Sequence, residues 1–223
     1  MKLLAIDTST EIASIAVLVG NDINSAEQGS QKTHAQLLLP MIDRLMVDSG
    51  ITVNQLDGII FGCGPGSFTG LRIACSTAKG IAYGHDLGLI PVSSLAAIAW
   101  SVRELNNDFS LPVLALLDAR MQEMYWGFFP ADCLMAEEKV NAVKDIQLDA
   151  PESIVLAGVG IENYWDDFPE QLKSRSNNHR LSMYPKACAM IRLALHAQLK
   201  PVSVAQAQPV YVRNQVTQGA SRG

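Results

Sequence analysis

The stretch Phe61–Gly84, FGCGPGSFTGLRIACSTAKGIAYG, decides the fold of this chain. Apolar residues lead into it, glycines and a proline crowd the segment from Gly62 to Gly70, and a run that suits a helix extends to about Tyr83. This order predicts a strand, a glycine-rich turn and a helix.

The glycine-rich turn has two interpretations. Glycine allows a sharp turn or a close approach of other atoms, and the free N–H groups at a helix start can hold an anion, so the turn could be a phosphate loop. However, no Gly-Lys-Ser/Thr closes it, and its spacing differs from the dinucleotide fingerprint. We therefore favour a tight strand-to-helix turn without a ligand.

The helix of this stretch has one face that is almost without side chains, since Gly70, Ala74, Ala78 and Ala82 recur every four residues. Such a face lets a second helix approach closely. The pattern indicates packing rather than catalysis, and the second helix could belong to this chain or to a partner.

Composition narrows the class of protein. The chain has 223 residues, enough for one sizeable core or two small lobes. Its formal net charge of −5 and its lack of a long basic run make it a poor stand-alone binder of nucleic acid. No segment resembles a signal peptide or a membrane span, and the 4 cysteines show no CxxC pairing. A cytoplasmic protein in a reducing environment is expected.

The amino-terminal segment predicts a β-hairpin with a polar tip. Lys2–Asp7 and Ala13–Val19 are apolar runs on either side of a short turn. Acids and hydroxyls at such a tip suit a nucleotide phosphate with its metal, but they also suit ordinary turn hydrogen bonding, which we favour. The tip carries Asp7, Thr8, Ser9, Thr10 and Ser14.

A second helix is predicted over Thr33–Ser49, opened by a possible capping box at Thr33–Gln36 and bent at Pro40. A surface helix needs only about a 100° apolar arc, and this one exceeds it. It is therefore buried on two sides, or its second side meets another protein. The apolar residues are Leu37, Leu38, Leu39, Met41, Ile42, Leu45, Met46 and Val47.

The second half of the chain repeats the pattern of the first. An apolar run again ends in an aspartate, at Asp118, and a second run returns after it. Two similar α/β lobes are predicted, residues 1–105 and 106–214, followed by a polar tail at 215–223. The expected elements are strands at 89–92, 112–118, 123–129 and 153–160, helices at 93–105 and 186–200, and an extended piece at 209–213.

Five segments together resemble the bacterial TsaB (YeaZ) family, in order and with similar spacing from Met1 to about Asn214. They are AIDTSTEIASIAV from Ala5, HAQLLLPMI from His34, GCGPGSFTGLRIACSTAKGIAYG from Gly62, LLDARMQEMYW from Leu116 and PVYVRN from Pro209. The resemblance implies an α/β fold of two related lobes, of the actin/hexokinase/Hsp70-like (ribonuclease H-like) type.

The resemblance also implies a function. The family takes part in making N6-threonylcarbamoyladenosine at position 37 of tRNAs that read ANN codons. A TsaB protein would be a non-catalytic subunit that pairs with its paralogue TsaD, which transfers the threonylcarbamoyl group, and with the ATPase TsaE. It would meet tRNA only as part of that complex.

The residues can be tested against this absence of catalysis. TsaD proteins carry an HxxxH metal pair, and the matching positions here are Ser94 and Ile98, which cannot replace imidazole ligands. Where TsaD has a glycine-rich phosphate turn in its second lobe, this chain has Asp118–Arg120, whose carboxylate repels phosphate. We expect no catalytic residue, metal or cofactor, and at most a vestigial phosphate turn at Asp7, Thr8, Ser9 and Thr10.

Three alternatives stay open beside this function. An ATP-dependent transferase or kinase of the superfamily would keep both phosphate turns. A peptidase would need a metal pair or an activated nucleophile, which the 4 scattered histidines do not suggest. A stand-alone homodimeric regulator would use the same helices as the TsaD partner.

We expect the partner interface on the two predicted helices, and the homodimer, if it forms, on the same surface. The residues are Leu37, Leu38, Met41, Ile42 and Leu45 on the first helix, and Gly70, Leu71, Ala74, Ala78 and Ala82 on the second. For Asp118, Arg120 and Glu123 near the cleft mouth we favour local ion pairing.

Overall fold

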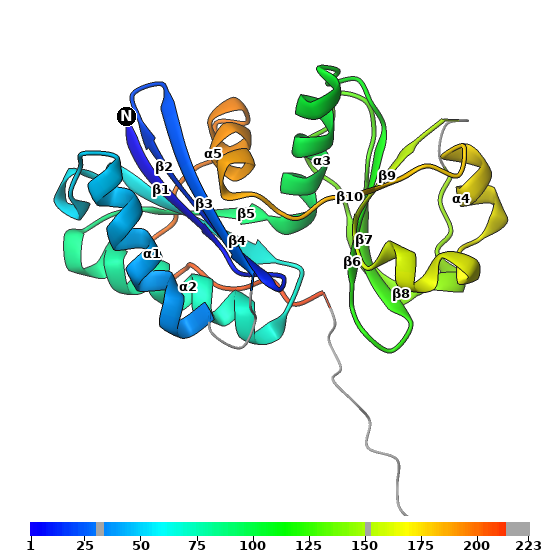
Figure 1. Cartoon of the computed structure of the whole chain (residues 1–223), viewed down its shortest axis with the longest axis horizontal. Helices are drawn as coiled ribbons and strands as arrows, with labels where there is room; N and C mark the ends of the chain where they lie inside the picture. Colours follow the sequence, from blue (N-terminus) through cyan, green and yellow to red (C-terminus); the bar gives the residue numbers. More distant parts are fainter. Residues whose placement is uncertain (30–33, 150–152, 213–223) are drawn as a thin grey trace, which may run out of the picture.

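The structure is a computed structural model that describes residues 1–29, 34–149 and 153–212. Two five-stranded sheets face each other across the middle of the molecule, with helices outside and between them (Figure 1). The expected capping box at Thr33 and the expected tail at 215–223 lie outside the described residues.

The first sheet has the strand order β3-β2-β1-β4-β5. β1 and β2 pair antiparallel as the predicted hairpin. β4 pairs parallel with β1, and β5 pairs parallel with β4. Leu3 and Ala5 belong to the core between the sheets, whereas Leu4 and Ile6 belong to the outer core. The strands are β1 (Lys2–Asp7), β2 (Ile12–Val19), β3 (Asp22–Gly29), β4 (Gly58–Gly64) and β5 (Leu89–Ser93).

The second sheet has the order β10-β9-β6-β7-β8, which is the same topology as the first. β6 pairs antiparallel with β7 and parallel with β9, as β1 does with β2 and β4. The predicted two-lobed α/β fold is therefore confirmed. The strands are β6 (Val113–Asp118), β7 (Glu123–Phe129), β8 (Glu138–Ala142), β9 (Val155–Val159) and β10 (Arg180–Ser182).

Helices α1 (His34–Asp48) and α2 (Phe68–His85) cover the outer face of the first sheet (Figure 1). Pro40 lies inside α1, which continues past it to Asp48. The Ser67 hydroxyl caps α2 by accepting a hydrogen bond from the Gly70 N–H at 3.3 Å. The outer face of the second sheet is covered by η3 (Val143–Asp145), η4 (Ile161–Asp167) and α4 (Glu170–Arg175).

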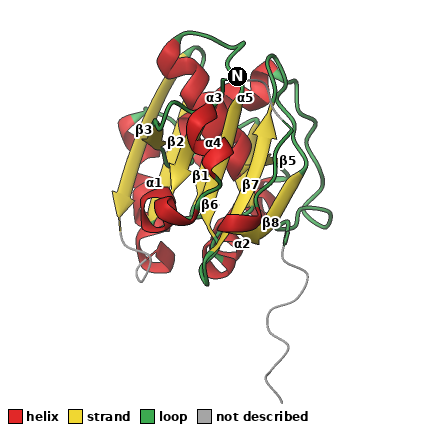
Figure 2. Ribbon diagram, turned by 90° about the vertical axis from the view of Figure 1, so that its right-hand side faces the viewer, coloured by secondary structure: helices red, strands yellow, loops and turns green. Residues whose placement is uncertain are grey.

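The two inner helices are exchanged between the lobes. α3 (Ser94–Asn106) follows the first sheet but contacts β6, β7 and β9, and α5 (Ala187–His196) follows the second sheet but contacts β1, β2 and β4. The two helices also contact each other (Figure 2). Each lobe thus supplies a helix to the core of the other.

A buried arginine fixes α3 to the second lobe. Arg103 is 1% exposed, and its guanidinium donates hydrogen bonds to the backbone carbonyls of Leu111, Phe129, Pro130 and Cys133. These hydrogen bonds offset the cost of removing the guanidinium from water.

The chain after α5 returns to the first lobe. Val202 and Leu89 form an isolated antiparallel bridge, and the Val210 N–H donates to the Cys63 carbonyl at 2.7 Å. Residues 201–212 therefore lie along the first lobe, from β5 to the end of β4. Of the residues described, no helix is long and apolar enough to cross a membrane.

Candidate functional site: an interlobe cleft and an outer helical face

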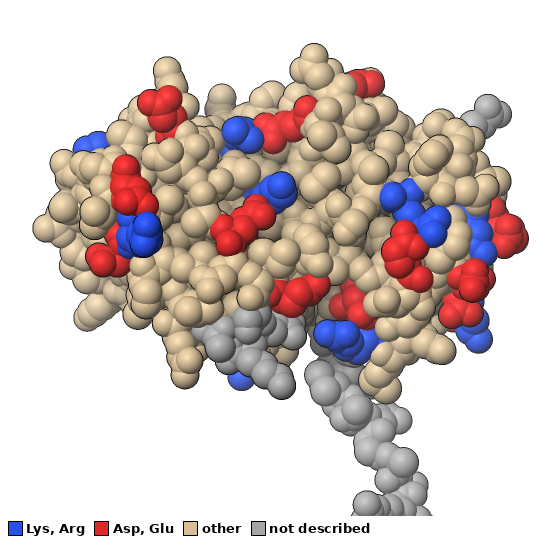
Figure 3. Space-filling model, viewed as in Figure 1, with Lys and Arg blue, Asp and Glu red and all other residues tan. Residues whose placement is uncertain are grey.

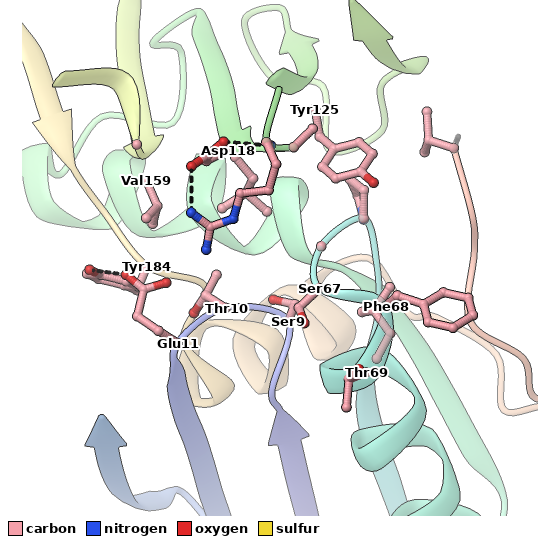
Figure 4. A pocket seen from close by; sticks show the side chains of 18 of the residues that line it. Ser9, Thr10, Glu11, Ser67, Phe68, Thr69, Asp118, Tyr125, Val159 and Tyr184 are labelled. Atoms are coloured by element: carbon pink, nitrogen blue, oxygen red, sulfur yellow. Dashed lines mark hydrogen bonds and ion pairs between the residues drawn. The ribbon is translucent and has the colours of Figure 1, made fainter. Parts of the chain in front are cut away.

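A cleft of about 1020 Å³ lies between the carboxyl ends of the two sheets (Figure 4). Its first-lobe wall includes the β1–β2 tip and the glycine-rich turn, and its second-lobe wall includes the β6–β7 turn. Ser9, Thr10, Ser67 and Phe68 line one side, and Asp118, Arg120 and Tyr184 line the other.

The polar tip of the first lobe borders the cleft, but its side chains are largely buried. Asp7 and Thr8 are 0% exposed, and Ser9 is 2% exposed. The Asp7 Oδ1 accepts hydrogen bonds from the Ser9 N–H at 3.1 Å and the Ser9 hydroxyl at 2.8 Å, and the Thr8 hydroxyl donates to the Gly70 carbonyl at 2.7 Å. These hydrogen bonds hold the tip together and join it to α2.

The glycines of the turn make room for this chain's own backbone. A Cβ on Gly70 would lie 1.8 Å from the Thr8 carbonyl oxygen, one on Gly66 would lie 2.5 Å from that of Ser9, and one on Gly64 would lie 2.8 Å from that of Val210. No side chain fits at such distances. The turn is therefore a junction between the β1–β2 tip, α2 and the carboxyl-terminal segment.

Asp7, at the end of β1, is a fully buried carboxyl group with a raised pKa. Burial raises its pKa from 3.8 to about 6, and the bonds from Ser9 only partly oppose this shift. Its Oδ2 has no hydrogen-bond partner in the described part of the chain, and the missing Cβ of Gly62 leaves the space that this oxygen occupies. The carboxyl group points into protein and not into the cleft.

The second-lobe turn is closed by its own side chains. The Asp118 Oδ1 accepts hydrogen bonds from the Arg120 N–H at 2.7 Å and the Tyr164 hydroxyl at 3.2 Å, and Arg120 forms an ion pair with the Asp118 Oδ2 at 3.3 Å. Arg120, Met121 and Gln122 all have left-handed backbone angles, with φ of 64°, 56° and 59°. The expected local pairing of Asp118 with Arg120 is present.

Side-chain hydrogen bonds join residues from the two halves of the chain. The Tyr184 hydroxyl donates to Glu11 at 2.7 Å, the Ala187 N–H donates to the Ser14 hydroxyl at 3.0 Å, and the Ser93 hydroxyl donates to the Glu138 carboxylate. Burial raises the pKa of Glu138. These bonds hold the two lobes in one arrangement.

The residues expected at the partner interface lie mostly on the inner faces of α1 and α2. Most of the expected residues face this chain's own sheet, because the close approach that small side chains permit is used by β4 and the β1–β2 tip. Leu38, Ile42, Leu45, Gly70, Leu71, Ala74, Ala78 and Ala82 are buried, and Leu37 and Met41 are partly buried.

The opposite faces of the same helices are exposed and partly apolar. Leu39 is 56% exposed and Val47 69% exposed on α1, and Tyr83 is 83% exposed on α2. A Cβ added at Gly80 or at Gly84 would meet no atom of the described chain within 4 Å outside its own turn of helix. The sequence contains a signal for this face too, since Ser76, Gly80 and Gly84 recur at the four-residue spacing of the buried stripe.

The positions that match the TsaD metal pair lie inside the protein. Ser94 and Ile98 are both 0% exposed on α3. Within residues 1–29, 34–149 and 153–212, no group of three or more His, Cys, Asp or Glu side chains is placed to hold a metal ion. The Ser94 hydroxyl has no partner within those ranges.

Comparisons with known proteins agree with this architecture. The family model for TsaD, the tRNA N6-adenosine threonylcarbamoyltransferase, matches residues 19–214. TsaB of Haemophilus influenzae is 33% identical over 97% of this chain and 95% of its own length, and TsaB of Escherichia coli is 34% identical over 97% and 96%. The structure of YeaZ from Pseudomonas aeruginosa is similar with a TM-score of 0.84 and 32% identity, covering 94% of this chain and 99% of that one.

Two sheets of one topology, facing each other across a cleft, define a two-lobed protein of the actin/hexokinase/Hsp70-like superfamily. In this molecule the β1–β2 turn and the β6–β7 turn are each held by hydrogen bonds between their own residues. The chain belongs to the TsaB (YeaZ) family, whose curated members carry the name tRNA threonylcarbamoyladenosine biosynthesis protein.

Proposed function

We propose that this chain is a non-catalytic subunit of the machinery that makes N6-threonylcarbamoyladenosine at position 37 of tRNA. It pairs with the catalytic paralogue TsaD, and TsaE joins the pair in the cytoplasm. The observation that carries this proposal is the internal closure of both turns at the cleft, together with an exposed apolar helical face on α1 and α2. A protein without an open phosphate turn, but with a surface for helices, suits a scaffold.

The proposed TsaD contact uses the outer face of α1 and α2. Leu39, Val47 and Tyr83 offer apolar area that a monomer leaves in water, and Gly80 and Gly84 let a partner helix approach the backbone of α2. Two helices of this chain and two of the partner would form a four-helix contact. A homodimer of the isolated chain would use the same face and would compete with TsaD.

The charge distribution supports a role for tRNA only within the complex. On the face seen in Figure 3, acidic and basic side chains are mixed and form no continuous basic band. The net charge of −5 opposes binding of a polyanion by the chain alone. The partner proteins would supply the positive surface.

The direct test is a tRNA modification assay with TsaD, TsaE and the remaining components, with and without this chain. Loss of threonylcarbamoyladenosine when the chain is omitted is the expected result. Full activity without the chain would refute the proposed function.

A pair of matched substitutions tests the proposed surface. Leu39→Glu places an unpaired charge in the apolar contact and should abolish association with TsaD, because burying such a charge is costly. Leu105→Glu makes the same change on α3, where Leu105 is 68% exposed, and should leave association intact. Equal association of TsaD with both variants would contradict the assignment of this face.

A further inference from the structure

The carboxyl-terminal segment forms an exposed cluster with the first turn of α2. The Phe68 and Tyr211 rings lie 5.2 Å apart between centroids, and the Arg72 guanidinium lies 3.7 Å from the centroid of the Phe68 ring. Phe68 is 50% exposed, Tyr211 41% and the adjacent Val210 49%. The cluster lies beside the cleft mouth, where Figure 4 shows Phe68.

Arg72 in this cluster is held in place but not neutralised. Its Nε donates a hydrogen bond to the Tyr211 hydroxyl at 3.2 Å, and its plane is supported by the Phe68 ring. In the described part of the chain, neither terminal nitrogen has an acceptor and no carboxylate pairs with Arg72. A guanidinium fixed in this way is preorganised for a carboxylate, which it can bind through two parallel hydrogen bonds.

Among the described residues, two other cations near this surface are already engaged. The Lys79 ammonium donates to the Ala207 carbonyl at 2.9 Å, and Arg120 pairs with Asp118. A nucleic acid strand requires several available cations. The described part of this surface presents the Arg72 guanidinium on an apolar, aromatic platform, which suits a carboxylate on a protein. Aromatic residues and arginine are also the types that dominate protein interfaces.

We propose that Phe68, Arg72 and Tyr211 form a receptor for a carboxylate-bearing segment of the partner protein. The receptor continues the outer face of α2, so it extends the partner surface onto the carboxyl-terminal segment of this chain. This inference rests on the proposed function, because the partner that carries the carboxylate is TsaD.

The carboxyl-terminal segment acquires a specific role in this arrangement. The Val210 N–H bonds to Cys63 at the end of β4, and the Val210 carbonyl fills the space beside Gly64. These contacts place Tyr211 where its hydroxyl orients Arg72. The segment therefore positions the residue that recognises the partner.

The experiment measures association of full-length TsaD from the same organism with the wild-type chain and with four variants. Arg72→Gln should weaken association about tenfold or more, since a hydrogen bond to a charged group is lost. Arg72→Lys should not restore it, because an ammonium keeps the charge but not the planar fork. Tyr211→Phe keeps the ring and loses the hydroxyl, so association should weaken by about threefold.

The control is Arg192→Gln, which removes another exposed arginine and its 3.1 Å ion pair with Glu104 on the α3–α5 side. It should leave association unchanged. All variants should melt within about 2 °C of the wild type, because the altered groups are exposed. If Arg72→Gln melts lower than this, Tyr211→Phe provides the test.

The outcomes separate this inference from the proposed function. If wild-type chain and TsaD do not associate, the proposed function fails. If they associate but Arg72→Gln and Tyr211→Phe change affinity no more than Arg192→Gln, only the receptor is refuted. Normal association of Arg72→Gln with TsaD, combined with weaker tRNA retention by the complex, would also overturn the receptor, in favour of a nucleic acid contact.

Discussion

Placing tryptophan at two positions of α2 tests which face of this helix meets its own sheet. Ala74 is 0% exposed within the outer core, whereas Gly80 has nothing within 4 Å of an added Cβ. Overpacking a close-packed site costs roughly 1–3 kcal/mol or more, and a ring as large as indole at Ala74 should lie at the upper end. At about 2–4 °C per kcal/mol for a chain of this size, Ala74→Trp should lower the melting temperature by about 6–12 °C.

Gly80→Trp should behave in the opposite way. Glycine in a helix interior is about 1 kcal/mol less favourable than alanine, so replacing it should leave the melting temperature unchanged or slightly higher. The ring would, however, block the close approach of a partner helix and abolish association with TsaD. Calorimetry measures the first effect, and co-purification measures the second. Normal melting of Ala74→Trp, or an equal fall for Gly80→Trp, would refute the assignment of the two faces.

Three further predictions concern Asp7, nucleotide binding and Gly158. The pKa of Asp7 is about 6 in the native state and 3.8 in the unfolded chain, so the native state binds more protons between these pH values. The free energy of unfolding therefore falls as the pH rises from the lower value to the higher one. The two values imply about 3 kcal/mol, and Asp7→Asn should remove this pH dependence in denaturant titrations; an unchanged slope would count against the buried carboxyl. ATP should bind the isolated chain weakly or not at all in calorimetry, because both cleft turns are bonded internally, and low-micromolar affinity would revive the kinase alternative. Gly158→Ala should destabilise the second lobe strongly, because the new Cβ would lie 1.7 Å from the Leu116 carbonyl oxygen and φ is 152°; soluble protein with wild-type melting would contradict the register of β6 and β9.

Local pattern was enough to predict the elements that are apolar and continuous. The β1–β2 and β6–β7 hairpins and helices α1, α2 and α3 were predicted from such runs and are present. β3, with the sequence DINSAEQG, was missed because it is an edge strand whose residues are mostly exposed and show no apolar alternation. β10 has only 3 residues, too few for a pattern.

The site was harder to predict, because its contacts join residues far apart in the chain. The sequence identifies the glycines of the turn, but it does not show that the Thr8, Ser9 and Val210 carbonyls fill the spaces beside them. Likewise, a four-residue spacing identifies a face of small side chains without identifying what packs on it. The buried stripe at Ala74 and the exposed stripe at Gly80 share that spacing, and only tertiary structure distinguishes them.

The exchange of α3 and α5 between the lobes has a consequence for folding during synthesis. α3 contacts the first sheet at β4 and β5, but the inner face of β1 and β2 is covered by residues 187–196, the last helix that the structure describes. The first lobe therefore cannot complete its core before α5 has been made, although its five strands are made first. Such long-range pairing makes folding slow, and it makes the two lobes a single cooperative unit. A cut between them would leave two fragments, each with a helix that belongs to the core of the other.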